Sequence, residues 1–413
     1  MPLRDALLCL ALLGADAAQA AAGDGRVSLS GSLAYQRGAL APESVAVVEL
    51  REVDRADAPA ALRAISEWRR ALGSEVPTAF RMDVDRAALT PGRAYVVRAL
   101  VLVSGRPARV ASSKPIALEG DAVDLGTLPL YPASQPPPRA LRCGDRNAIM
   151  RAGDVADLIA GARRWVMNPV KVGSLRYAAA EPQLTTLWVS GQQATLVVEG
   201  QRWDECTVEP FRARGNEPSW ILELGSRLSF STPEARLEAA LPALQTSADT
   251  LRYVTTARGK PIAVTVYERR CADSMSGMPH PHAVEVTALG RTYRGCGGEP
   301  RALLQGAEWV VSDVSGTSFA GSRVTLNFGA DGRAYGRGPC NPYDAGYELG
   351  AEGLRFSLAP STLESCETRV MREERAFFEA LGQVERFEIA DDGALVLLAR
   401  GDRKITARVS EVP

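Results

Sequence analysis

The spacing of six cysteines is the feature that most constrains this chain. No two of them stand in a Cys-x-x-Cys arrangement, which argues against a zinc ribbon or a thioredoxin-like redox motif. Six cysteines allow 15 disulfide pairings. The spacing favours the simplest set, in which each pair lies inside its own stretch: Cys143–Cys206, Cys271–Cys296 and Cys340–Cys366. Each bridge would close a loop of tens of residues and contribute about 3–4 kcal/mol in the chain-entropy model.

The N-terminus has the pattern of an export signal. Arg4 precedes the apolar run Ala6–Gly14, and Ala18-Gln19-Ala20 fits a cleavage site. We therefore expect residues 1–20 to be a signal peptide and the protein to be periplasmic, in an oxidising compartment where disulfides persist. The seventh cysteine, Cys9, is expected to leave with the signal. The alternative, a lipid-modified cysteine, is disfavoured because leucines rather than small residues precede it.

Charge and hydropathy exclude several classes of partner. Lys and Arg number 48 and Asp and Glu 49, for a net charge of −1. A balanced chain has no basic field with which to hold nucleic acid. No stretch after the signal approaches the roughly 18 apolar residues that a membrane helix requires, so we expect no transmembrane segment. A length of 413 residues predicts several domains.

Residues 26–132 alternate apolar and polar side chains, which predicts half-buried strands. An all-β sandwich is the economical solution, with a short helix in the insert Ala61–Gly73. The expected strands are Val27–Tyr35, Val45–Glu52, Ala79–Val84, Ala94–Val103 and Val110–Leu118. The blocks "VSLSGSLAYQRGALAPESVAVVELREVDRADAPA" and "FRMDVDRAALTPGRAYVVRALVLVSGR" resemble the YbaY-like family, which is related to type III secretion pilotin lipoproteins. That resemblance implies an envelope protein with possible outer-membrane association.

Residues 131–138 contain three consecutive prolines and are predicted to be a stiff linker. Residues 139–209 begin with "LRCGD" and end with "WVSGQQATLVVEGQRWDEC", and a hairpin turn is expected at Glu199-Gly200 and a helix over residues 153–168. This segment resembles the small β-barrel of membrane-bound inhibitors of c-type lysozyme, in which the helix would be an insertion. The resemblance implies two partner-binding loops, carried here by Gly173, Ser174, Tyr177, Ser190 and Gly191. Ser190 stands where that family has lysine, which removes the strongest contact such a site could make with lysozyme carboxylates.

Residues 210–300 are predicted to be a further β domain. The stretches "GNEPSW", "CADSMSG" and "RGCGG" resemble a bacterial envelope domain that often follows a lysozyme-inhibitor-like segment. The expected strands are Ser219–Leu224, Leu251–Thr255, Ile262–Glu268 and Ala283–Ala288.

Residues 301–413 contain "EWVV", "VTLNFGADGRAYGRGPCNPYDAGYEL" and "LRFSLAPSTLESC", which are similar to the META domain, the fold of the heat-shock protein HslJ. One long helix is expected over Glu367–Leu381, with Val370, Met371, Phe377, Phe378 and Leu381 on its apolar face. The charged cluster Arg369, Arg372, Glu373, Glu374 and Arg375 is expected on the solvated face.

The stretch Cys271–His282 contains both histidines of the chain, two serines and an aspartate. A metal site would need imidazoles and a thiolate on one ion, but Cys271 is better explained by a disulfide, and prolines interleave with His280 and His282. A hydrolase would need a serine activated by a histidine, but "DSMSG" is not a nucleophile elbow. We therefore predict a disulfide-anchored, exposed polar turn. We expect Trp188, Trp203, Trp220 and Trp309 to be core residues or hairpin staples.

Together these patterns predict a mainly β protein, with several small β-sandwich or β-barrel domains in series and one short helix near the C-terminus. No catalytic residue, metal site or cofactor is expected. We predict an exported, non-catalytic binding or stress-protection module of the periplasm or outer membrane, whose partner is an unknown envelope protein or c-type lysozyme. The alternatives are a lysozyme inhibitor acting through residues 139–209 and a hydrolase.

Overall fold

The structure is a computed structural model of the chain. It describes residues 25–35, 44–52, 66–72, 77–103, 106–133, 135–170, 175–179, 185–247, 249–319, 323–350, 353–358 and 364–410. The expected signal peptide lies outside these residues, as do Gly173 and Ser174. Within the described ranges, no helix combines the length and the apolar character that crossing a membrane requires.

Two sheets pack face to face in the N-terminal part, as expected for a sandwich. One sheet has the order β4-β1-β8; the other has the order β3-β2-β5-β6-β9, with β7 paired to β5. The strands are β1 (Arg26–Ala34), β2 (Val45–Glu52), β3 (Ser66–Ala71), β4 (Thr78–Asp85), β5 (Ala94–Val103), β6 (Arg106–Ser112), β7 (Ile116–Ala117), β8 (Ala122–Pro129) and β9 (Tyr131–Pro132), and the 3-10 helix η2 spans Arg86–Ala88.

Strict alternation explains this core. Along β4, Thr78, Phe80, Met82 and Val84 are buried and the residues between them are exposed, since successive side chains of a strand point to opposite faces. By contrast, β2 is buried on both faces over most of its length. The expected helix in Ala61–Gly73 is wrong for Ser66–Ala71, which pairs with β2 as an edge strand; residues 61–65 and 73 lie outside the described part.

Residues 139–208 form a closed barrel in which each strand pairs with the next and the last returns to the first. Its strands are β10 (Arg139–Cys143), β11 (Arg146–Ala152), β12 (Ala156–Ala160), β13 (Arg163–Pro169), β14 (Arg176–Ala179), β15 (Thr186–Ser190), β16 (Gln193–Val198) and β17 (Gln201–Val208). The disulfide Cys143–Cys206 joins β10 to β17. The expected turn at Glu199-Gly200 is present, and both residues have a positive φ.

Two expectations about this part are corrected. The helix expected over residues 153–168 is wrong, because the hairpin of β12 and β13 occupies that stretch. The segment predicted to be a stiff linker is partly strand and is packed: Tyr131–Pro132 pairs with β6, Gln135, Pro137 and Pro138 are buried, and the Gln135 side chain donates to the Val155 carbonyl of the barrel. Prolines leave no backbone donor for a ladder, so residues 135–138 carry no strand even though they are packed.

The third part is a nine-stranded sheet with the order β21-β20-β19-β18-β28-β27-β24-β23-β22, and a two-stranded ribbon, β25-β26. Its disulfide joins Cys271 to Cys296. The strands are β18 (Phe211–Asn216), β19 (Ser219–Leu224), β20 (Arg227–Ser231), β21 (Arg236–Ala240), β22 (Gln245–Thr246), β23 (Thr250–Ala257), β24 (Lys260–Tyr267), β25 (Cys271–Ala272), β26 (Pro279–His280), β27 (His282–Ala288) and β28 (Arg291–Gly297), followed by the 3-10 helix η3 (Pro300–Leu303).

The last part is another nine-stranded sheet, in which the one α-helix of the described residues packs on the core. Phe377 and Leu381 of that helix are fully buried. The disulfide Cys340–Cys366 ties the loop at Cys340 to the segment that precedes the helix. The elements are β29 (Trp309–Val314), β30 (Thr317–Ser318), β31 (Thr325–Phe328), β32 (Arg333–Arg337), β33 (Pro342–Gly350), β34 (Gly353–Leu358), α1 (Thr368–Leu381), β35 (Val384–Ile389), β36 (Leu395–Ala399) and β37 (Lys404–Val409).

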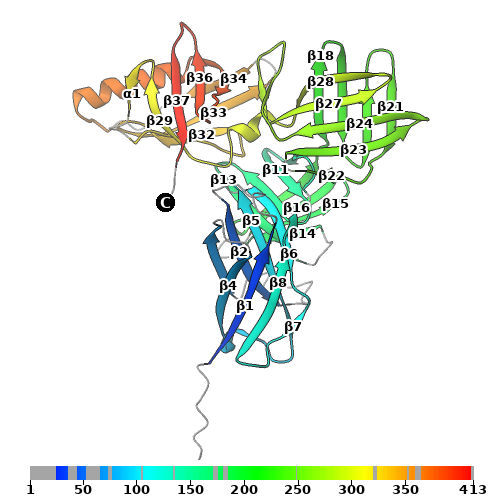
Figure 1. The fold of residues 1–413 in the computed structure, drawn as a ribbon. Helices are drawn as coiled ribbons and strands as arrows, with labels where there is room; N and C mark the ends of the chain where they lie inside the picture. Colours follow the sequence, from blue (N-terminus) through cyan, green and yellow to red (C-terminus); the bar gives the residue numbers. More distant parts are fainter. Residues whose placement is uncertain are drawn as a thin grey trace, which may run out of the picture.

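The barrel contacts each of the other three parts, and Figure 1 shows it between the N-terminal sheets and the last two parts. Asn168 Nδ2 of the barrel donates to Glu49 Oε2 of β2 at 2.7 Å. Arg151 makes a bidentate ion pair with Glu268 of the third part, at 2.7 and 2.9 Å. The backbone of Asn147 donates to the carbonyl of Ala330 in the last part. Met278 of the third part is buried in the core of the last part.

Candidate functional site

The stretch Cys271–His282 folds as a closed turn between β25 and β26. The carboxylate of Asp273 accepts hydrogen bonds from the backbone of Met275 and Ser276, the hydroxyl of Ser276 and the amide of Asn216, at 2.8 to 3.2 Å. Burial alone would raise the pKa of Asp273, but these hydrogen bonds outweigh it and lower the pKa to about 2. The aspartate is therefore a fixed anion that closes the turn.

The tip of this turn, residues 274–277, is exposed as expected, but its two histidines are buried, which corrects the expectation for them. His280 is 8% exposed and His282 is 1% exposed. Their Nδ1 atoms lie 2.8 Å from the Gly298 carbonyl and 3.2 Å from the Tyr267 carbonyl, respectively. Pro279 and His280 form the two-residue strand β26, which pairs with Ala272 and Cys271 of β25. A ribbon this short tolerates the prolines on either side of His280. Burial lowers the pKa of His280 below 6.5.

These contacts bear on the two chemistries considered for the turn. The Ser276 hydroxyl donates to Asp273, whereas both histidine Nδ1 atoms face backbone carbonyls, so the serine and the histidines serve different partners. Cys271 is in the disulfide. In the part of the chain that the structure describes, no group of three His, Cys, Asp or Glu side chains gathers as metal ligands would. The turn has the contacts of a structural element that docks the third part on the last.

Three of the barrel residues expected to bind a partner, Tyr177, Ser190 and Gly191, lie in the described part of the chain. Tyr177 lies on β14 with its ring 1% exposed, and its hydroxyl donates to the Gly153 carbonyl at 2.8 Å. Burial, followed by the charge of Asp154, raises the pKa of Tyr177 to about 12. Ser190 and Gly191 are exposed in the turn between β15 and β16. The placement of Tyr177 in an exposed loop is thus corrected, because its ring fills the barrel interior; whether these residues bind a partner stays a prediction.

Trp188 is the one of the four tryptophans Trp188, Trp203, Trp220 and Trp309 that lies at the surface. Trp203, Trp220 and Trp309 are buried, as expected, but Trp188 on β15 is 45% exposed. The guanidinium of Arg176, directly opposite on β14, lies 4.1 Å from the centroid of its ring. Its neighbours in the strand, Leu187 and Val189, point into the barrel, so the alternation that could have placed Trp188 outside is present in the sequence.

The sequence analysis missed a buried carboxylate on the C-terminal helix. Glu374, expected on the solvated face, is only 3% exposed. Its carboxylate accepts from the Asn341 backbone at 2.7 Å, the Asn341 side chain at 3.0 Å and the Cys340 backbone at 3.3 Å. The spacing could have placed Glu374 on the apolar face, since it lies four residues after Val370 and three residues before Phe377. Glu374 thus holds the Cys340 loop against the helix.

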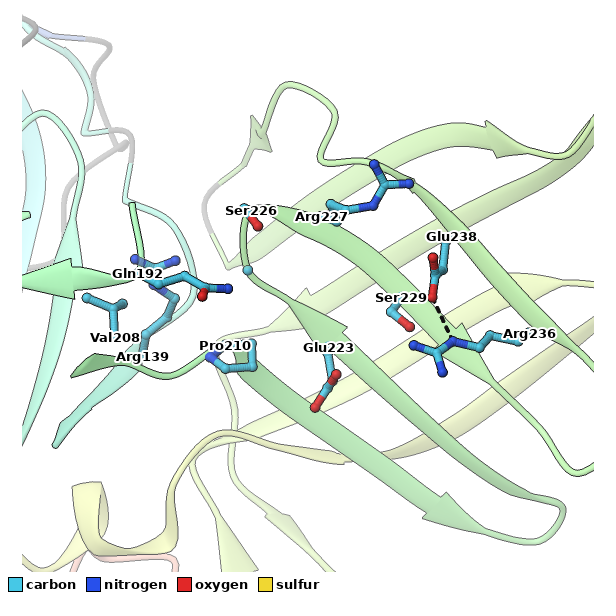
Figure 2. A pocket seen from close by; sticks show the side chains of 11 residues that line it. Arg139, Gln192, Val208, Pro210, Glu223, Ser226, Arg227, Ser229, Arg236 and Glu238 are labelled. Atoms are coloured by element: carbon cyan, nitrogen blue, oxygen red, sulfur yellow. Dashed lines mark ion pairs between the residues drawn. The ribbon is translucent and has the colours of Figure 1, made fainter. Parts of the chain in front are cut away.

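An open pocket of about 200 Å³ lies where the barrel meets the third part (Figure 2). The barrel contributes Arg139, Gln192 and Val208, and the third part contributes Pro210 and the outer ends of its hairpins. Two carboxylates at the rim are engaged: Arg236 Nε lies 2.7 Å from Glu238, and Arg212 Nε donates to Glu223 at 2.9 Å. The guanidinium of Arg139 is half-buried beside the ring of Tyr253.

Comparisons with known proteins match the two ends of the chain. Residues 302–411 match the family model of the META domain, and residues 25–125 match that of the type III secretion system lipoprotein chaperone (YscW). Neither match covers half of the chain. The resemblances noted above for the first and last segments are therefore confirmed, whereas those for residues 139–209 and 210–300 stay predictions. No curated protein matches the chain.

Two solved structures are similar to part of the chain. One is an alternative pilotin from the type II secretion system of Vibrio cholerae, with 25% identity, 26% of this chain and 97% of that chain covered, and a TM-score of 0.22. The other is the NMR structure of a protein from Burkholderia xenovorans, with 25% identity, 27% of this chain and 87% of that chain covered, and a TM-score of 0.24.

Proposed function

We propose that the protein is an exported, non-catalytic module of the bacterial cell envelope that binds a partner protein and serves in stress protection. The observation that carries the proposal is the union, on one chain, of a segment that matches a lipoprotein chaperone with one that matches a META domain. Three disulfides support an oxidising compartment, because such bridges are rare where thiols are kept reduced.

The packing of the N-terminal sandwich limits where a partner can bind. The outer face of its larger sheet is covered by the barrel: Val47, Leu100 and Leu102 cluster with Val155. Glu49 and Arg51 of the same face are buried and bonded to each other. The smaller sheet leaves the outward residues of β4 exposed. We infer that a partner of the chaperone-like segment contacts the β4-β1-β8 sheet or an edge strand.

Site-specific photo-crosslinking in living cells tests both statements. A crosslinking residue at Arg81, which is exposed on β4, should capture a partner in the envelope fraction. The same residue at Leu100, covered by the barrel, is the matched control and should capture none. Alkylation in the same cells should find the six bridging cysteines oxidised. Recovery of the chain with reduced thiols in the cytoplasm would refute the proposed location, and capture from Leu100 alone would refute the proposed face.

A further inference from the structure

The charges do not balance around the pocket between the barrel and the third part, which we call the junction pocket. Glu238 and Glu223 are each paired with an arginine, Arg236 and Arg212. In the described part of the chain, the guanidinium of Arg139 has neither a carboxylate partner nor a hydrogen-bond acceptor, and the same holds for Arg227 across the pocket. Tyr253, which interacts electrostatically with Arg139, has a pKa raised by burial to about 12 and is neutral at physiological pH. The pocket therefore presents uncompensated positive charge.

A half-buried guanidinium without a partner needs an explanation, because removing a cation from water is costly unless an anion or acceptors compensate. Other arginines that are buried or half-buried in this protein have such partners: Arg51 bonds Glu49, and Arg151 bonds Glu268. Arg139 differs in that it lines an open cavity. The cavity lets a molecule from solution supply the missing acceptor.

We propose that this pocket binds a small molecule through one anionic group, a carboxylate or a phosphate, held by Arg139. The guanidinium offers a planar fork of donors that matches either group in a bidentate way. The side-chain amide of Gln192 stands beside Arg139 on the barrel side of the pocket (Figure 2) and supplies a further donor. Arg227 adds positive charge at the rim.

The size of the cavity restricts the ligand. Pockets for drug-sized ligands enclose about 300–1,000 Å³, and this one encloses about 200 Å³. A small organic acid, a phosphate ester or the charged end of a longer chain fits the space. The serine hydroxyls of Ser226 and Ser229 on the far wall provide polar contacts for the remainder of such a molecule.

The experiment is an NMR titration of the full chain at low ionic strength with two probes, succinate and inorganic phosphate. The observed signals are the side-chain amide of Gln192 and the backbone amides of Gly225 and Ser226. We expect at least one probe to shift these signals with a dissociation constant near about 1 mM, typical of a single charged contact. A response to succinate alone identifies a carboxylate ligand, and a response to phosphate alone identifies a phosphate ligand.

Variants decide whether Arg139 is the cause. Arg139→Gln should weaken binding at least about tenfold, which is about 1.4 kcal/mol. Arg139→Lys keeps the charge but loses the planar fork of donors, so its affinity should lie between those of the wild type and Arg139→Gln. This variant provides the test if Arg139→Gln does not fold. Arg81→Gln, an exposed arginine of the N-terminal sheet, is the matched control and should bind like the wild type. Unshifted signals with both probes at tens of millimolar, or shifts that persist in Arg139→Gln, would overturn the proposal.

Discussion

Two regions of this protein concentrate polar side chains, and they differ in how those side chains are satisfied. In the turn at 271–282, Asp273 has four donors and each histidine Nδ1 faces a carbonyl, while the buried Nε2 of His280 has no hydrogen-bond partner in the described chain. In the junction pocket, Arg139 is half-buried with no acceptor in the described chain. The first region has the residue types of an active site and the contacts of a structural turn. The second has no motif that marks it in the sequence, and its contacts leave the guanidinium of Arg139 available to a ligand.

A substitution at Asp273 is the strongest test of this comparison. Asp273→Ala should lower the local free energy of opening by about 3 kcal/mol, because it removes the acceptor of four hydrogen bonds, from the Met275 and Ser276 backbone, the Ser276 hydroxyl and the Asn216 amide. Hydrogen exchange of the amides around Cys271 and Cys296 measures this change. Asp83→Ala, which removes an exposed carboxylate, is the control and should leave these amides unchanged.

The same carboxylate has a pH dependence of known sign. Its folded pKa of about 2 lies below the ordinary value of 3.8, so the stabilisation is fully present above about pH 4 and is lost as the pH falls from 4 to 2. In Asp273→Ala this part of the acid transition should vanish. An acid response of the turn that is identical in both proteins would contradict the assigned role.

The histidines provide the second test. An exposed loop would predict a change below about 1 kcal/mol on replacing both, but the burial of His280 and His282 predicts a loss of about 2 kcal/mol for the double alanine variant. The lowered pKa of His280 means that the fold favours its neutral form. Its stabilisation is therefore present above about pH 6.5 and declines as the pH falls below that value. Hydrogen exchange of the β26 and β27 amides at pH 7 and pH 5 measures both effects; equal protection at the two pH values would refute the second.

Tyr177 gives the third and smaller effect. Tyr177→Phe removes the hydrogen bond to the Gly153 carbonyl and should cost about 1 kcal/mol in barrel stability. Because the ring is buried, the variant should not change any binding at the barrel surface. Thermal unfolding of the full chain, with Tyr131→Phe as an exposed control, separates these outcomes.

Lysozyme inhibition is expected to be poor, since the first loop has Gly173 where the resembling family has serine, and the second has Ser190 where it has lysine. Losing a buried charged contact typically costs about 2–5 kcal/mol in affinity. An activity titration with c-type lysozyme measures it, and Ser190→Lys with Gly173→Ser should strengthen any inhibition. Nanomolar inhibition by the unmodified chain would contradict this expectation.

The sequence predicted those features that depend on local pattern. Alternation identified β5 and β19 with their observed bounds, and even spacing identified the three disulfides. It failed where tertiary pairing overrides local propensity. Residues 153–168 contain good helix formers, yet sheet closure makes them a hairpin of the barrel. Ser66–Ala71 is likewise drawn into a strand by the edge of β2.

The junction pocket could not be predicted for a different reason. Contacts between distant parts of the chain leave no local signal in the sequence. Nothing near Arg139 in the sequence shows that Gln192 and Glu223 will lie around the same cavity. Similarly, the prolines beside His280 suggested an open loop, and no local pattern shows that the neighbouring Met278 packs into the core of the last part. By contrast, the buried Glu374 could have been found, since its spacing from Phe377 places it on the apolar helix face.

The smallest expected effect belongs to Arg139 itself. Without a ligand, Arg139→Gln should change stability by less than about 0.5 kcal/mol, because no protein partner is lost and a poorly solvated charge is removed. Arg151→Gln is the matched variant on the same barrel; it breaks a bidentate ion pair with Glu268, so it should cost about 3 kcal/mol. Thermal unfolding of both variants in a buffer of low ionic strength without carboxylate or phosphate makes the comparison. If the two arginines proved equally costly to replace, Arg139 would have a partner within the chain, and the contrast between the fully bonded carboxylate of the turn and the unpaired guanidinium of the pocket would fail.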